Sequence, residues 1–190
     1  MSTQPLNTLS AENYLELERA AEQKHEYIDG EMVAMAGGSA THAFIATNCI
    51  FALMQALGGG ACRVFTSDLR VCVHWDRLIT YPDVTVVCGP LRFADVRKDT
   101  ITNSTLLIEV LSPSTKNFDR GEKAARYRDL SSLQEFLLID QTPVEVEHYR
   151  RLADGSWQII THRDRAATID LASVHAVLPI AAIYQGVEQL

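Results

Sequence analysis

One acidic residue stands inside the most apolar stretch of the sequence. In residues 105–111, Leu106, Ile108 and Val110 form one face of an expected strand, and the opposite face is apolar except for Glu109. A strand that is apolar on both faces is usually central and covered on both sides. An ionised carboxylate there is costly unless it is paired or binds a metal. Glu109 is therefore predicted to be a metal ligand or a catalytic acid, with a buried ion pair or a solvent-facing strand end as the alternatives.

A second carboxylate begins another expected strand. Asp83 follows Pro82 at the start of the β-branched residues 82–87, and the first position of a strand tolerates a proline. Pro-Asp is also a common turn element, so Asp83 gains weight only if its strand neighbours that of Glu109. Two carboxylates brought together in this way, with carbonyl oxygens and water, suit a hard cation such as Mg²⁺, with Mn²⁺ as the other choice.

A lysine lies in the helix expected directly after the Glu109 strand. At 100° per residue, Lys123 shares a stripe with Arg126, Tyr127 and Leu130. Tyr127 and Leu130 are the natural core-facing residues, so Lys123 is predicted to point toward the sheet or along its edge. A lysine that extends past apolar neighbours to reach solvent remains an equal alternative.

Two further residues are weaker candidates for the same site. Glu31 follows the expected turn at Asp29-Gly30 and could supply a third acid, although an exposed hairpin residue is the favoured interpretation. His42 begins an expected helix, and a histidine in a first turn is more often solvated or capping than a ligand.

Several familiar catalytic motifs do not occur in the sequence. It has no Gly-rich phosphate loop followed by Lys and Ser/Thr, no G-x-S-x-G and no G-x-G-x-x-G, so no organic cofactor is expected. Its four cysteines, at positions 49, 62, 72 and 88, form no C-x-x-C pair. We therefore expect neither a zinc site nor a disulfide framework, but buried, reduced thiols in the cytoplasm.

Length and composition indicate an ordinary globular protein. The chain has 190 residues, of which 47% are hydrophobic and 22% charged, which suits one domain with a substantial core. The most apolar run, 44–57, contains Thr47, Asn48 and Gln55, so no membrane span is expected. Residues 1–9 contain neither a basic residue nor an apolar segment, which predicts a flexible N-terminus without a signal peptide.

The net charge of −7 argues against non-specific binding of nucleic acid, because neutralising phosphates needs a basic surface. The charge is unevenly distributed, since residues 1–35 carry seven acids and two bases. Residues 116–128 carry five bases and two acids. One basic stripe is therefore present, and the total charge does not decide whether DNA is a partner.

The expected elements alternate between helices and strands. Their order predicts an α/β or mixed α+β domain with one central sheet, in which 105–111, 119–130 and 136–139 form a βαβ unit. Asp119 and Glu122 are placed like a capping box at the start of the helix in this unit. The other expected elements are a helix at 10–24, a hairpin around 29–30, a helix at 41–57, strands at 63–74 and 82–87, a loop at 89–104, a hairpin of 144–149 with 157–161, and a short closure near 179–184.

Taken together, the motifs resemble one known family. They occur at 26–31 (EYIDGE), 39–42 (SATH), 81–84 (YPDV), 108–115 (IEVLSPST), 119–123 (DRGEK), 127, 133–140 and 180–187. This string is similar to the Uma-two family of restriction-endonuclease domains, which falls within the PD-(D/E)XK nuclease-like superfamily. The resemblance covers about residues 10–187. It implies a restriction-endonuclease-like core, a mixed central sheet flanked by helices, with an N-terminal helix and hairpin.

The resemblance also implies a site. Asp83 and Glu109 match the acids of the superfamily, which would bind Mg²⁺. The usual lysine two residues after the glutamate is Leu111 here, and Lys123 is the matching residue from the following helix, with Lys116 as the fallback. The resemblance further raises Glu31 and His42 as site members.

The implied activity is metal-dependent hydrolysis of phosphodiester bonds in DNA. A homodimer is expected, because duplex-cutting enzymes commonly use two-fold symmetry. Two alternatives stay open. One is a non-catalytic nucleic-acid- or protein-binding module that retains the fold, in which Glu109 and Lys123 form a structural ion pair. The other is a metal-dependent hydrolase of a non-DNA substrate such as a nucleotide.

Overall fold

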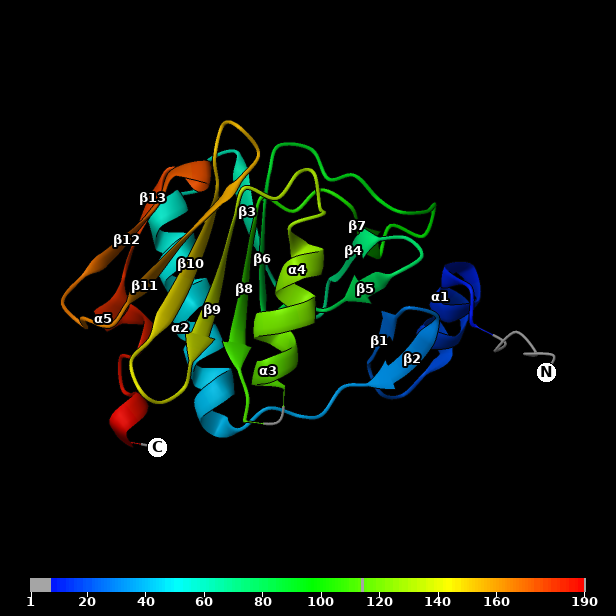
Figure 1. Cartoon of the computed structure of the whole chain (residues 1–190), viewed down its shortest axis with the longest axis horizontal. Coiled ribbons are helices and arrows are strands. Elements are labelled where there is room, and N and C mark those ends of the chain that lie inside the picture. Colours follow the sequence, from blue (N-terminus) through cyan, green and yellow to red (C-terminus); the bar gives the residue numbers. More distant parts are fainter. Residues whose placement is uncertain (1–7, 114, 190) are drawn as a thin grey trace.

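The computed structural model describes residues 8–113 and 115–189. Its largest sheet is mixed and has six strands (Figure 1). The strand order is β11-β10-β9-β8-β6-β3. The strands are β3 (Cys62–Thr66), β6 (Val84–Cys88), β8 (Leu106–Leu111), β9 (Glu135–Asp140), β10 (Val146–Arg151) and β11 (Trp157–His162).

Helices cover both faces of this sheet. On one face lies α2 (Ala40–Leu57), with the two-stranded sheet of β12 (Thr168–Leu171) and β13 (Ala176–Pro179) and the short helix α5 (Ile180–Ile183). On the other face lies a helix of three consecutive segments. These are α3 (Lys116–Phe118), the π-helical η1 (Asp119–Lys123) and α4 (Ala124–Tyr127). Two 3₁₀ turns, η2 (Ala172–Val174) and η3 (Val187–Gln189), lie in the C-terminal part.

Strand β8 occupies the centre of the fold, as its apolar sequence predicts. It pairs antiparallel with β6 and parallel with β9, and all six of its residues are buried. Parallel strands need a crossover connection, and here the helix from Lys116 to Tyr127 provides it. The predicted βαβ unit is therefore confirmed.

A second, five-stranded sheet packs beside the helix of the βαβ unit. Its order is β2-β1-β5-β4-β7. Helix α1 (Ala11–Ala20) covers this sheet by burying Tyr14 and Leu15 against it. The strands are β1 (His25–Ile28), β2 (Glu31–Ala34), β4 (Arg70–His74), β5 (Leu78–Thr80) and β7 (Thr100–Ile101). The expectation of one central sheet is therefore incomplete, because the N-terminal hairpin joins β5, β4 and β7 in a second sheet.

The prediction of one strand across 63–74 is wrong. A turn at Ser67 and Asp68 divides it into β3 and β4, which belong to different sheets. Asp68 is exposed in this turn and pairs with Lys24 across 2.5 Å. The alternating pattern continued through the turn, so periodicity alone did not reveal the break. Residues 89–104 are mostly loop, as expected, but they contain β7.

The helix boundaries follow the predictions in part. Ser10 caps α1 and accepts a hydrogen bond from the Asn13 amide, but this helix ends at Ala20 rather than residue 24. Helix α2 ends as expected at Gly58, whose φ of 53° is accessible to glycine without strain. The prediction of a capping box at Asp119 is wrong. The helix has already begun at Lys116, and the backbone amide of Asp119 donates to the carbonyl of Thr115.

The cysteines divide into a bonded pair and two free thiols. Cys62 and Cys88 face each other across β3 and β6 and form a disulfide, so the expectation of four reduced thiols is wrong for these two. Cys49 and Cys72 are free and buried, as expected. The pairing depends on the register of two strands, which the spacing of cysteines in sequence does not give.

Within residues 8–113 and 115–189, one helix, α2, is long and apolar enough to cross a membrane by length and composition alone. Its mean hydropathy is 1.3, and 17% of this 18-residue window is buried. The core helix of a soluble protein passes the same test, so this feature is weak evidence for a membrane.

Candidate active site

The backbone places Asp83 opposite Glu109. In the antiparallel pair of β6 and β8, Val84 faces Ile108 and Thr85 faces Leu107. Continuing this register by one step brings Asp83 opposite Glu109. Because side chains alternate along a strand, Glu109 projects to the same face as Leu107, the face covered by α4. Burial raises the pKa of Glu109, and the nearby charge of Asp83 adds to the rise. The two acids therefore lie near each other at one end of the paired strands β6 and β8.

Asp83 is held by one backbone group and one histidine. Its Oδ2 accepts a hydrogen bond of 2.7 Å from the amide of Val110, and its Oδ1 lies 2.9 Å from Nε2 of His42. The hydrogen bond with Asp83 raises the pKa of His42, against the effect of burial. His42 reaches this position from the first turn of α2, where its amide donates to the side chain of the N-cap residue Ser39. His42 is thus brought to Asp83.

Lys123 is buried and faces the acids, as its helical stripe predicts. Its side chain is 6% exposed, and Nζ lies 2.9 Å from Oε1 of Glu109. The same nitrogen lies 2.9 Å from Oε1 of Glu26 and 3.8 Å from Oδ1 of Asp119. The hydroxyl of Tyr127, one turn further along, donates to Oε1 of Glu109. We call Glu26, Glu109, Asp119, Lys123 and Tyr127 the lysine cluster.

Burial and charge set the protonation of this cluster. Burial raises the pKa of Glu109 to about 8, although Lys123 opposes the rise. Burial alone would lower the pKa of Lys123, but the acids around it, with Glu109 first, raise it well above its ordinary value. Burial also opposes ionisation of Glu26, yet Lys123 and the hydroxyl of Thr80 lower its pKa. Lys123 is therefore held as a cation, with Glu26 as an ionised partner.

A π-helical turn carries two members of the cluster. Asp119 and Lys123 are the first and last residues of η1, and both are buried. Burial raises the pKa of Asp119. Single π-helical turns are rare and occur frequently at functional sites. No pattern in the sequence indicates this turn, which is why the spacing predicts Asp119 at a helix start, whereas the structure places it 3.8 Å from Nζ of Lys123.

Two of the candidate residues lie elsewhere. Glu31 is exposed at the start of β2, and in residues 8–113 and 115–189 it makes no hydrogen bond or ion pair with the lysine cluster. Lys116 is exposed at the start of α3, whereas Lys123 makes the contacts. The acid that the hairpin contributes is Glu26. Strand alternation places Glu26 on the face of β1 opposite Tyr27, which packs toward α1, but the hairpin register puts Glu31 on that same face. Alternation alone therefore does not single out Glu26.

The donor set fits a hard divalent cation that keeps several waters. Mg²⁺ commonly binds one or two carboxylates and retains water, and Asp83 and Glu109 supply two carboxylates at one end of the β6-β8 pair. The described residues contain no group of three or more His, Cys, Asp or Glu side chains placed to hold a metal. One oxygen of Glu109 is already engaged by Lys123 and Tyr127, so the other, Oε2, would be the donor.

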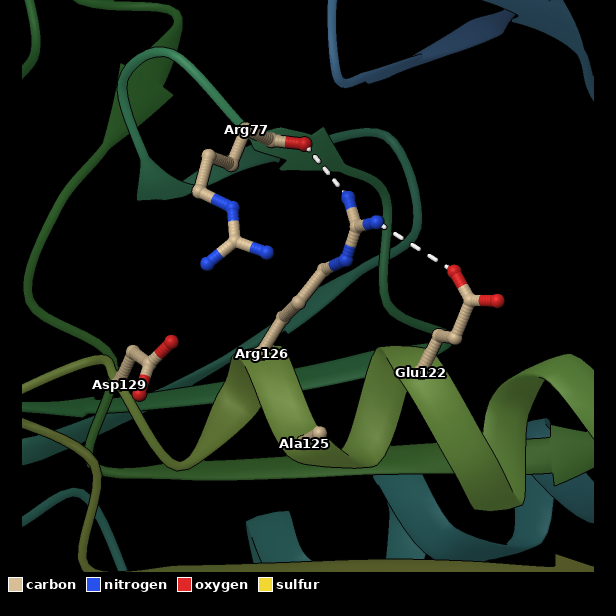
Figure 2. A pocket seen from close by; sticks show the side chains of 5 residues that line it. All are labelled: Arg77, Glu122, Ala125, Arg126 and Asp129. Carbon is tan, nitrogen blue, oxygen red and sulfur yellow. Dashed lines mark hydrogen bonds and ion pairs between the residues drawn. The ribbon is translucent and has the colours of Figure 1, made fainter.

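A surface hollow of about 410 Å³ lies on the outer side of the same helix (Figure 2). Arg126 dominates it and is already satisfied, because it donates to the carbonyl of Arg77 at 2.8 Å and contacts Asp29 and Glu122. The lining contains two arginines and two acids, so its charges balance. The lining residues are Arg77, Glu122, Ala125, Arg126 and Asp129. We do not assign this hollow to the site.

Comparison with known proteins connects this geometry to a family. Residues 11–181 match the family model described as "Uma2: Putative restriction endonuclease". The chain is 38% identical over 184 residues to a protein of Synechocystis sp., "Uncharacterized protein slr1290", covering 96% of this chain and 94% of that protein. It is 36% identical over 164 residues to "Uncharacterized protein sll1609" of the same organism, covering 86% and 93%.

The fold is similar to a solved structure. A crystal structure described as "a putative nuclease belonging to DUF820", from Anabaena variabilis, matches with a TM-score of 0.77 over 94% of this chain and 99% of that one. The sequence identity is 19%, so this likeness shows the fold alone. The expected mixed α/β nuclease-like fold is confirmed, and so is the family indicated by the motifs. The chain belongs to the Uma2 family.

Proposed function

We propose that this protein is a metal-dependent endonuclease that hydrolyses phosphodiester bonds in DNA. The observation that carries the proposal is the convergence of Asp83, Glu109 and Lys123 from two adjacent strands and the crossover helix. Two carboxylates beside a lysine combine a cation-binding pair with a positive group that can stabilise a reacting phosphate.

The proposed site residues divide into binding, orienting and charge-stabilising roles. Asp83 and Glu109 would hold Mg²⁺, or Mn²⁺ in its place, and the bound ion would supply a polarised phosphate and a more acidic water. His42 and the Val110 amide fix the orientation of the Asp83 carboxylate. Lys123 would contact the attacking water or a phosphate oxygen and stabilise negative charge as it develops. Glu26 keeps the Lys123 ammonium in place.

Cleavage assays with matched variants test this function. Wild-type protein is incubated with supercoiled plasmid and with single-stranded DNA, in Mg²⁺, Mn²⁺ or EDTA. We expect cutting that requires metal and is lost in Asp83→Asn, whose side chain keeps the shape of the original. The control is Asp154→Asn, in the exposed turn between β10 and β11. No cutting by folded wild-type protein with either metal would contradict the proposal.

One observation favours a second candidate, a binding module that retains the fold without catalysis. The lysine cluster is internally paired, since Lys123 contacts three acids and Tyr127 donates to Glu109. Metal binding separates the two candidates, because a ligand that binds only the folded state raises the melting temperature. We expect millimolar Mg²⁺ to raise the melting temperature of wild type but not of Asp83→Asn. No shift in either protein would favour the binding module.

The proposed partners follow from the proposed chemistry. DNA is the proposed substrate, but the net charge of −7 keeps a nucleotide or another phosphodiester as the alternative. DNA contacts through phosphates must weaken as salt rises, so binding that is insensitive to salt would favour the alternative. We also propose a cytoplasmic homodimer without an organic cofactor.

A further inference from the structure

Exposed apolar side chains gather on one helix. Among the described residues, α2 leaves three large apolar side chains in solvent: Phe44 at 39%, Phe51 at 62% and Met54 at 60% exposure. Each of the other exposed large apolar side chains lies on a different segment: Leu17, Val33, Val96, Leu152, Ile159 and Val177. Single exposed apolar residues are normal, whereas a contiguous group marks an interaction site.

The spacing of these residues fits helix packing. Phe44, Thr47, Phe51 and Met54 follow one another at intervals of three, four and three residues, and all four are exposed. This is the spacing of the seam along which two helices pack. The opposite side of α2 already packs on the six-stranded sheet through Ile45, Cys49 and Leu53. We call the four exposed residues the α2 stripe.

Covering the α2 stripe leaves few polar groups without partners. The hydroxyl of Thr47 donates to the carbonyl of Ala43 at 2.8 Å, so it needs no partner from outside. The side-chain amide of Asn48, which lies beside the stripe, donates to the carbonyls of Ile183 and Gln185. Burying a polar group is costly only when its hydrogen bonds are lost.

The lack of charged residues on α2 indicates which kind of molecule covers the α2 stripe. None of the 18 residues of α2 is Asp, Glu, Lys or Arg. In a two-fold interface each patch meets its own copy, so any charge near the axis would face a like charge. A helix that lies on a membrane surface carries Lys and Arg on its polar side, and α2 has neither. Partners of different sequence are usually selected by complementary charges, which the stripe also does not offer.

We infer that the α2 stripe is the interface between two copies of this chain, packed with their α2 helices antiparallel. The antiparallel arrangement places Phe44 against Met54 of the second copy and Thr47 against Phe51, which fills each small position with a large side chain. It also opposes the two helix dipoles favourably. This inference is independent of the nuclease proposal, because it uses no residue of the site.

Sedimentation of the full chain and two single variants tests the interface. We expect wild type to be a dimer at micromolar concentration and Phe51→Glu to raise the dissociation constant at least about tenfold, because two carboxylates are then buried beside the axis. The matched control is Ile159→Glu, on the edge strand β11, where Ile159 is 53% exposed. This control should remain a dimer. Circular dichroism checks that Phe51→Glu, altered at a largely exposed position, is folded.

Other outcomes would overturn the inference. A monomeric wild type, a dimer unaffected by Phe51→Glu, or a dimer broken by Ile159→Glu would each do so, the last by assigning the interface to the β11 edge. Co-sedimentation with phosphatidylglycerol vesicles is measured in parallel. Vesicle binding that Phe51→Glu abolishes would assign the stripe to a membrane instead.

Discussion

The Nζ of Lys123 lies 2.9 Å from Oε1 of Glu109, although the two residues belong to different elements. The lysine therefore reaches the acid from the crossover helix rather than from the strand that carries it. Position 111, two residues after Glu109 on the same face of β8, is a buried leucine within the core. The crossover helix thus supplies the positive charge beside Glu109 that strand β8 does not carry.

Replacing Lys123 and Lys116 in turn should show which of the two lysines supports cleavage. Lys123→Met keeps the apolar stem but removes the charge, and we expect the cleavage rate to fall about 100-fold or more, because a positive group beside the reacting phosphate is lost. Removing one partner of a buried ion pair also costs about 3 kcal/mol of unfolding free energy. Assays are therefore run below the melting temperature of the variant. Lys116→Met, at an exposed position, should cleave like wild type, and equal losses in both variants would contradict the assignment.

Glu26 is expected to act as a positioning residue. Glu26→Gln keeps the size of the side chain but removes the ionised partner of Lys123, so we expect the cleavage rate to fall about tenfold while metal affinity is unchanged. Calorimetric titration with Mg²⁺ measures the affinity, and plasmid nicking measures the rate. Glu31→Gln is the matched control from the same hairpin and should alter neither. A parallel loss of affinity in Glu26→Gln would instead make Glu26 a metal ligand.

The central part of the site was predictable because local patterns and strand pairing agree there. Glu109 interrupts a strand that is apolar on both faces, and Lys123 lies on the core-facing stripe of the next helix. The chain order alone makes this strand and helix neighbours, since a βαβ connection packs back on its own sheet. Asp83 then required only that β6 pair with β8.

The rest depended on tertiary contacts that no local pattern encodes. Glu26 and Glu31 look equivalent in sequence, and the hairpin register places both on the same face. Glu26 lies on the inner strand β1 and contacts Lys123, whereas Glu31 lies on the edge strand β2 and is exposed. The π-helical turn at Asp119 has no signature in sequence. The division between β3 and β4 was hidden because polar and apolar residues continue to alternate through the turn at Ser67.

A buried acid at the start of β9, Glu135, should make stability depend on pH. Burial opposes the ionisation of Glu135, but hydrogen bonds from His148, Ser173 and Arg150 lower its pKa to about 2. A lowered pKa stabilises the fold above the ordinary pKa near 4.5, and this contribution is lost as the pH falls from there to about 2. We therefore expect Glu135→Gln to cost about 2 to 3 kcal/mol at neutral pH and clearly less at the acidic end of that range.

Urea denaturation of wild type and Glu135→Gln measures the difference in their free energies of unfolding. It is carried out at neutral pH and at several pH values between 4.5 and about 2. The control is Glu16→Gln, at an exposed position of α1, which should show no pH-dependent difference from wild type. The prediction is contradicted if the difference in unfolding free energy between wild type and Glu135→Gln stays constant as the pH falls. The Glu135 carboxylate would then not be stabilised in its ionised form by its three hydrogen-bond donors.

Thiol counting should distinguish the bonded cysteines from the free ones. Protein unfolded without reductant should expose two reactive thiols, Cys49 and Cys72, and reduction should release the thiols of Cys62 and Cys88 as well. The folded protein should react slowly, because burial raises the pKa of Cys72 to about 11 and raises that of Cys49 further. Four thiols in the unreduced, unfolded protein would contradict the pairing. Replacing both Cys62 and Cys88 with serine should lower the unfolding free energy by about 3 kcal/mol, since the bridge closes a loop between residues 26 positions apart.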